Sequence, residues 1–196
     1  MINKFTGRFD FLSNFYLHKV DFEGVTYPSS EHAYQAAKTL DKSLRLGIAN
    51  LPTPGKAKKA GKNLELREDW EDVKVDIMRE ILVTKFQDPE LQTKLLDTGY
   101  HELIEGNTWG DRFWGVCEGT GQNHLGKLLM SIRQNIMQVV GTPKYEQGAM
   151  VTWGEVKCQI EEVHWESGHW KYWIRPTAQG FLDIIITESN ELKYTR

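Results

Sequence analysis

The spacing of large apolar residues along the chain predicts two long amphipathic helices. Such residues recur every three or four positions from residue 70 to residue 86, and again from residue 125 to residue 139. This period places apolar side chains on one stripe of a helix, where they can pack on a core. Asn123 precedes the second helix as a candidate N-cap, and Gly141 follows it as a C-terminal stop.

Shorter patterns complete the N-terminal part of the chain. Apolar alternation on both sides of Glu23-Gly24, ending at Pro28, predicts a β-hairpin. Ser29 or Ser30 can cap the helix that follows, and Thr53-Pro54 is typical of the start of another. Helices are therefore predicted over residues 31–40, 43–51, 55–62 and 89–99. Residues 101–106 predict a strand, and a loop follows it.

After residue 149 the pattern changes to short β-rich runs separated by turn residues, which predicts a β-meander. The sequence thus predicts an α+β protein with a mainly helical core, a small β-hairpin or sheet, and a β-rich C-terminal extension. The expected domains are residues 1–141, a linker over residues 142–149, and an extension over residues 150–196. That extension either packs its tryptophans on the core or forms an interface for self-association or for a protein partner. Its tryptophans are Trp153, Trp165, Trp170 and Trp173.

Composition excludes some functions. The 196 residues carry a formal net charge of -3, so the chain has no general attraction to nucleic acid or to an anionic membrane, and a polyanion would need a local basic patch. Cys117 and Cys158 are far apart and lack partners at metal-ligand spacing, so we expect reduced thiols, no metal site and no cofactor. With no signal-type N-terminus and no apolar run near ~20 residues, we expect a cytoplasmic protein, in the host cytoplasm if it is viral, with no membrane partner.

The helix predicted over residues 31–40 has one polar face. Glu31, Tyr34, Gln35 and Lys38 stand at positions i, i+3, i+4 and i+7 and therefore share that face. In the first turn the helix dipole should hold Glu31 ionised, as a carboxylate base must be. The competing interpretation is a solvated surface with ordinary capping.

Two further places can carry chemistry. Trp70 begins the long apolar stripe, so it is either a core residue or a ring that stacks on a base or ribose at the edge of a pocket. The second place is the Gly-rich stretch from Trp109 to Asn123. Backbone N–H groups at a helix N-terminus that follows glycines favour an anion such as a phosphate. The stretch matches neither the Walker A pattern nor the Rossmann fingerprint.

Taken together, these residues suit one type of reaction. They supply two separated carboxylates (Glu31 and Asp111), one lysine, stacking aromatic rings and a loop suited to phosphate, without a metal cage or a Ser-His-Asp order. Cleavage of a glycosidic bond in a nucleotide requires such parts, because an oxocarbenium-like centre must be stabilised while a nucleophile is delivered.

Five blocks carry a family resemblance. In order they are LSNFY, YPSSEHAYQAAK, REDWEDVK, WGD and GTGQNHLGKLLMSIR. With them the chain resembles the NADAR family, also called YbiA-like N-glycosidases, over about residues 8 to 140. Members of that family cleave N-glycosidic bonds of ribose derivatives. The associated activities are hydrolysis of the ribosylaminopyrimidine phosphates of the riboflavin pathway and removal of ADP-ribose from guanine.

The resemblance implies roles for individual residues. Glu31, Trp70 and Asp111 are expected in the active site, and Lys38 matches a lysine proposed to attack the anomeric carbon through a Schiff base. The mechanism expected is that Glu31 orients or deprotonates water or Lys38, while Asp111 supports the cationic ribose carbon or protonates the leaving nitrogen. Residues expected to bind substrate or shape the pocket are Arg8, Asn14, Phe15, Tyr34, Trp70, Trp109, Gly110, Arg112, Gly119, Gly121, Asn123 and Gly126. Of these, the turn over residues 119–123 is expected to receive phosphate together with Arg8 or Arg112.

The substrate cannot be carried over from the family, because the segment RFWGVCE after WGD belongs to a loop that varies among its members. We favour removal of ADP-ribose from guanine, in a nucleoside or in nucleic acid. Lys56, Lys58, Lys59 and Lys62 could accept a pyrophosphate or a nucleic-acid backbone, although a solvated lysine face is the simpler explanation of them. The alternatives are a small ribosyl-nucleotide substrate from the riboflavin pathway and a non-catalytic module that binds ADP-ribose or NAD.

Overall fold

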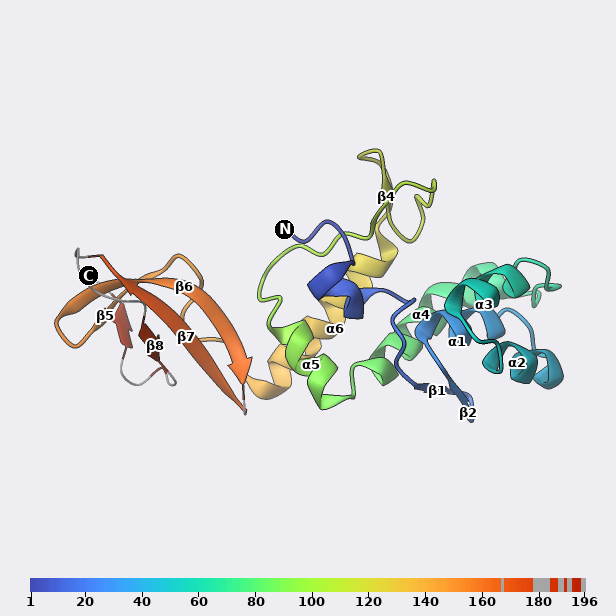
Figure 1. The fold of residues 1–196 in the computed structure, drawn as a ribbon, viewed down its shortest axis with the longest axis horizontal. Coiled ribbons are helices and arrows are strands. Elements are labelled where there is room, and N and C mark those ends of the chain that lie inside the picture. Colours follow the sequence, from blue (N-terminus) through green and yellow to red (C-terminus); the bar gives the residue numbers. More distant parts are fainter. Residues whose placement is uncertain (167, 178–183, 187–188, 190–191, 195–196) are drawn as a thin grey trace. The chain divides into compact units, whose positions relative to one another are not determined.

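The computed structural model describes residues 1–166, 168–177, 184–186, 189 and 192–194 (Figure 1). The chain divides into two compact units. The first comprises Met1–Gln92 and His101–Ile132, and the second comprises Thr93–Tyr100 and Arg133–Arg196. Helices and small sheets together confirm the predicted α+β class.

The first unit begins with a 3-10 helix, η1 (Gly7–Leu12), and a β-hairpin of β1 (Val20–Phe22) and β2 (Val25–Tyr27). The hairpin is as predicted, since Glu23 and Gly24 both have positive φ, which a two-residue turn of this kind requires. The helices that follow are α1 (Ser30–Ala36), α2 (Lys42–Ala49), α3 (Pro54–Gly61) and α4 (Trp70–Lys85). All four were predicted, with α1 ending earlier than expected.

Side-chain caps fix where these helices start. The Ser29 hydroxyl accepts a hydrogen bond from the backbone N–H of His32, and the Thr53 hydroxyl accepts one from Lys56. Asp41 caps α2 in the same way. Helix α1 packs against α2, α3, α4 and β1, so it lies at the centre of this unit. All seven of its residues are buried, which excludes the solvated surface considered for its polar face.

The predicted strand over residues 101–106 is mostly absent. Only Gly106 belongs to a strand, β3 (Gly106–Asn107), which pairs in parallel with β4 (Val116–Cys117). Leu103 makes a single bridge to Ile2 instead. The partners of this segment are the single residue Ile2 and the two-residue strand β4, so its strand pairing stays short. Leu103 is nevertheless buried, as the apolar pattern requires.

The cap predicted at Asn123 is also wrong. Helix α6 (His124–Val140) begins after it, but Asn123 has φ of 53° and its side chain bonds elsewhere. Its Nδ2 donates to the carbonyl of Leu103 at 2.9 Å, and its Oδ1 accepts from the N–H of Glu105 at 3.1 Å. Asn123 therefore holds the chain before β3 rather than the first turn of α6.

The second unit contains a five-stranded antiparallel sheet. Its strands are β5 (Met150–Trp153), β6 (Val156–Glu166), β7 (His169–Pro176), β8 (Ile184–Ile186) and β9 (Leu192–Tyr194). Strands β5 to β8 form the predicted meander, whereas β9 returns to the free edge of β5, giving the order β8-β7-β6-β5-β9. In Figure 1, β6 and β7 are the long neighbouring arrows. The strand predicted from residue 180 is described only at residues 184–186, because residues 180–183 lie outside the described part.

The predicted linker over residues 142–149 packs into this second unit. Tyr145 is fully buried in the core, and its hydroxyl donates to the carbonyl of Leu192. The Tyr172 hydroxyl accepts from the N–H of Lys144 at 2.7 Å. These residues therefore behave as part of the sheet domain rather than as a spacer. Of the four tryptophans in this unit, only Trp173 is exposed, and a role for them in self-association stays a prediction.

Helix α5 (Pro89–Leu96) was predicted, and Gly99 follows it with φ of 53°. Among the described residues, no helix combines the length and the apolar character that crossing a membrane would require.

Candidate active site

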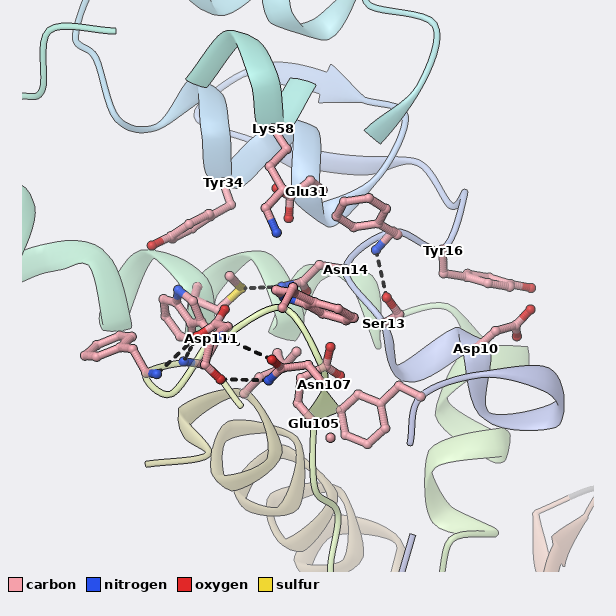
Figure 2. Close-up of a pocket in the computed structure, with 18 of the residues that line it drawn as sticks. Asp10, Ser13, Asn14, Tyr16, Glu31, Tyr34, Lys58, Glu105, Asn107 and Asp111 are labelled. Carbon is pink, nitrogen blue, oxygen red and sulfur yellow. Dashed lines mark hydrogen bonds between the residues drawn. The ribbon is translucent and has the colours of Figure 1, made fainter. Parts of the chain in front are cut away.

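A cavity of about 1320 Å³ lies within the first unit. Figure 2 shows Glu31, Tyr34 and Lys58 on one side of it, facing Glu105, Asn107 and Asp111 on the other. Eight of the residues expected at the site line this cavity. They are Asn14, Phe15, Glu31, Tyr34, Lys38, Trp70, Trp109 and Asp111.

Glu31 is buried in the first turn of α1. Its backbone N–H donates to the carbonyl of Asn14 at 2.9 Å, and its Oε1 accepts from Gln35 Nε2 at 2.8 Å. Burial raises the pKa of Glu31, while the Gln35 hydrogen bond and the charges of Lys58 and Lys38 oppose that rise. Desolvation therefore acts against the helix dipole, which was expected to hold this group ionised. A raised pKa brings a carboxylate base closer to neutral pH, where general bases work best.

Lys38 follows the end of α1 and is half-buried. Burial lowers the pKa of its ammonium group, Glu31 opposes this, and the like charges of Lys58 and Lys62 add to it. Its Nζ lies 5.9 Å from the ring centroids of both Tyr34 and Trp70. The lowered pKa is the condition that an amine nucleophile requires, because only the neutral amine can attack.

Aromatic rings form two groups around the cavity. Inside it, the Tyr34 ring lies 5.2 Å from that of Trp70 and 5.3 Å from that of Trp114. Trp70 is buried, as a core residue would be, and it also lines the cavity, so stacking on a base or ribose stays a prediction. At the rim, the exposed rings of Phe15 and Trp109 lie 5.6 and 5.8 Å from Lys58 Nζ.

Asp111 is held in a tight loop. Its N–H donates to Asn107 Oδ1 at 3.0 Å, and its carbonyl accepts from Asn107 Nδ2 at 2.7 Å (Figure 2). Its Oδ1 accepts from the backbone N–H groups of Phe113 and Trp114, at 3.1 and 2.8 Å. One carboxylate oxygen is therefore fixed by the loop, and the group is positioned as an acceptor beside the cavity.

Seven residues expected to bind substrate or to shape the pocket do not line the cavity that the described residues form: Arg8, Gly110, Arg112, Gly119, Gly121, Asn123 and Gly126. The guanidinium of Arg8 lies 4.6 Å over the ring of Phe9, and Arg112 pairs with Glu118 at 3.1 Å. Neither arginine is placed to receive a phosphate inside the cavity.

The turn before α6 is not open to an anion either. The backbone N–H groups of Gln122, His124 and Leu125 donate to carbonyls of residues 112–114, at 2.7, 3.2 and 3.0 Å. An anion at a helix N-terminus needs these donors to be unengaged. The geometry therefore does not support the phosphate site expected over residues 119–123.

Glu105, which lines the cavity and is half-buried, was not predicted from the sequence. Burial raises the pKa of Glu105 to about 7, with the charges of Asp111 and Glu31 adding to the rise. Lys85 was also missed: it is fully buried, and its Nζ donates to the carbonyl of Ser13 at 2.9 Å. The signal available was a charged residue at an apolar position, since Glu105 ends an apolar run and Lys85 lies on the buried face of α4.

The described residues contain no cluster of three or more His, Cys, Asp or Glu side chains that could hold a metal ion.

The comparison with known families agrees with this geometry. A family model described as the NADAR domain matches residues 3–137. This chain belongs to the NADAR domain family. The match takes in every element that contributes to the cavity, from the segment before η1 to the first turn of α6.

Named relatives of this NADAR domain include two kinds of protein. N-glycosidase YbiA of Shigella flexneri is 41% identical over 128 residues, which cover 63% of this chain and 79% of the relative. N-glycosidase Npun_R5314 of Nostoc punctiforme is 37% identical over 135 residues, covering 65% and 86%. Riboflavin biosynthesis protein VVA0006 of Vibrio vulnificus is 37% identical over 132 residues, covering 65% of this chain but 36% of the relative.

A solved structure shares the fold of this NADAR domain. The NMR structure of the E. coli protein YbiA superposes with a TM-score of 0.62 at 31% identity, covering 75% of this chain and 94% of that chain. The predicted family is confirmed, and with it the prediction of an N-glycosidase enzyme, since the relatives of which the chain covers 79% and 86% carry that name.

Proposed function

We propose that this N-glycosidase removes ADP-ribose from guanine, cleaving the bond between the anomeric carbon of ribose and a nitrogen of the base. The single observation that carries the substrate choice is the size of the cavity, about 1320 Å³. Pockets for drug-sized ligands are usually about 300–1,000 Å³. A ribosylaminopyrimidine phosphate would fill a small part of this space, whereas ADP-ribose joined to guanine has two bases, two riboses and a pyrophosphate.

The two aromatic groups fit a substrate with two bases. The inner rings of Tyr34 and Trp70 lie beside Lys38, whereas the rim rings of Phe15 and Trp109 lie beside Lys58. Stacking on aromatic rings is the sequence-tolerant way to bind a nucleobase. A substrate with a single pyrimidine ring needs only one of these groups.

The charges that face the cavity suit a pyrophosphate at the rim. Of the four lysines in α3 and at its end, Lys58 lines the cavity, while Lys56, Lys59 and Lys62 are exposed. Lys58 can therefore meet an anion inside, whereas the other three could contact only a longer polyanion outside. An oligonucleotide substrate would depend on these outer lysines and would show a strong salt dependence.

The reaction needs a nucleophile, a base and a group that stabilises positive charge. Glu31 accepts a proton from the nucleophile, which is water or the Lys38 amine. As the C–N bond breaks, its electron pair leaves with the base nitrogen, and the carboxylate of Asp111 stabilises the cationic ribose carbon. If Lys38 attacks, water later hydrolyses the covalent adduct and restores the amine.

A second candidate rests on the relatives. Some of them are named riboflavin biosynthesis proteins, including the Vibrio vulnificus protein and PYRR of Zea mays, which is 32% identical over 151 residues. The chain covers only 36% and 24% of those two proteins. Their names support a ribosylaminopyrimidine phosphate as the alternative substrate.

The experiment is a comparison of substrates. The purified protein is incubated with ADP-ribosylated guanosine, an ADP-ribosylated oligonucleotide and a ribosylaminopyrimidine phosphate, and released base and sugar are followed by mass spectrometry. Glu31→Gln and Lys38→Ala should lose activity, and Lys59→Ala, on the exposed face of α3, is the matched control for guanosine. Release from the pyrimidine alone would refute the guanine proposal, and tight binding of ADP-ribose without turnover would indicate a binding module.

A further inference from the structure

Glu105 is a third carboxyl group in the cavity wall, and its backbone is held on both sides. Its N–H donates to Asn123 Oδ1 at 3.1 Å, and its carbonyl accepts from the N–H of Val116 at 2.9 Å. Gly115 approaches so closely that a Cβ there would lie 2.2 Å from the Glu105 carbonyl oxygen. The side chain therefore starts from a fixed point, beside Asn107 in Figure 2.

The carboxyl group of Glu105 is in an environment that favours its neutral form. Its Oε2 is buried and has no hydrogen-bond partner among the described residues. Burying an ionised oxygen without a donor is costly, while the carbonyl oxygen of a neutral carboxyl tolerates it far better. Burial is the largest cause that raises the pKa of Glu105, to about 7, and the negative charges of Asp111 and Glu31 add to the rise. The positive charges of Lys58 and Lys85 oppose it.

The carboxyl groups of Asp111 and Glu31 are arranged as acceptors. Asp111 Oδ1 takes two backbone N–H donors, and Glu31 Oε1 takes the Gln35 side-chain amide. A guanine nitrogen leaves far more readily with a proton than as an anion. Asp10 also lines the cavity but is exposed to solvent. Because Asp111 and Glu31 are arranged as acceptors, Glu105 is the half-buried carboxyl group left to supply this proton.

We propose that Glu105 is the general acid of this site and protonates the leaving nitrogen of the base. The inference rests on the function proposed above. As the C–N bond breaks, its electron pair passes to the base nitrogen, which takes the proton of the Glu105 carboxyl and leaves a carboxylate. The nucleophile gives its own proton to Glu31. After products leave, Glu31 returns a proton to solvent and Glu105 regains one, so the net reaction is addition of water across the C–N bond.

The protonation state can be measured without substrate. Infrared difference spectra of the full chain, taken against Glu105→Gln, should show a protonated-carboxyl band at mildly acidic pH that disappears with a midpoint of about 7. Glu102→Gln, an exposed carboxyl three residues earlier, is the matched control and should remove no such band. Absence of the band at mildly acidic pH would overturn the proposal.

The catalytic role is tested by changing the leaving group. Loss of a general acid typically costs about 10²–10⁴ in rate, so Glu105→Gln should lower kcat on ADP-ribosylated guanosine by roughly that factor. The same ADP-ribose joined to 4-nitrophenol needs no proton to leave, and its cleavage should fall much less. Equal losses on the two substrates, or an unchanged pH profile, would refute the role of Glu105. Absence of base release by the wild-type protein from any ribosyl substrate would instead refute the proposed function.

Discussion

Lys85 allows a quantitative test of how burial controls charge beneath the cavity. It is fully buried in α4, its Nζ donates to the carbonyl of Ser13, and burial lowers its pKa to about 7 against the attraction of Asp10 and Glu105. The unfolded chain has a higher pKa at this residue, so it binds more protons than the folded protein between the two values. Stability must therefore increase as pH rises through that range.

The magnitude follows from the two pKa values, 10.5 in an ordinary lysine and about 7 here. Each tenfold change in an acid constant is worth about 1.4 kcal/mol, so the Lys85 contribution between about pH 7 and about pH 9 comes to roughly 2 kcal/mol of added stability. Lys85→Met keeps an unbranched side chain of similar length without the charge. The variant should lack this pH-dependent gain and should be more stable than the wild type near neutral pH.

The assay must report on the first unit alone, because the chain has two compact units. Cys117 is buried in the first unit and Cys158 in the second. Pulsed thiol labelling in a urea series, with each cysteine identified by peptide mass, gives an unfolding midpoint for each unit. The comparison at Cys117 is between wild type and Lys85→Met at the two pH values. Equal pH dependence in both proteins would refute the reasoning.

Three further predictions concern the site. Trp109→Ala should raise KM by about tenfold or more with unchanged stability, because an exposed ring that stacks on a base contributes about 1–3 kcal/mol of binding; an unchanged KM would remove Trp109 from the substrate site. Asn123→Ala should lower the free energy of unfolding by roughly 2–4 kcal/mol in the same labelling assay, since Leu103 and Glu105 each lose a hydrogen-bond partner, and Asn123→Asp should recover about half. Lys38→Arg should abolish any adduct trapped by borohydride, because a guanidinium stays charged; an adduct that persists would exclude Lys38 as the nucleophile.

Periodicity predicted the part of the site that lies on regular helices. Glu31, Tyr34 and Lys38 were placed together by helical spacing alone, and α1 and the two residues after it bring them to one cavity. The spacing did not reveal that the polar face of α1 is buried. A short helix surrounded by three others has no solvated side, and that is a property of packing between segments far apart in the sequence.

The loop side of the site was less predictable. Asp111 was expected from the family motif, but it is held by the Asn107 side chain and by the backbone N–H of Trp114, in turns whose hydrogen bonds do not follow a period. Asn123 has the residue type of a helix cap and stands at the right position, yet its side chain serves Leu103 and Glu105 instead. Local propensity could not show this choice, because the competing partners lie about twenty residues away in the chain.

Three glycines near α6 are positions that saturation mutagenesis should find intolerant to substitution. An added Cβ at Gly115, Gly121 or Gly126 would lie 2.1 or 2.2 Å from a backbone carbonyl oxygen. None of the three lines the cavity that the described residues form. We expect substitution at each of them to be as damaging as substitution of Glu31, because the backbone segments behind the reactive groups could no longer pack against one another. In this protein, positions that do not tolerate mutation would therefore include glycines that pack the loops together as well as residues that contact substrate.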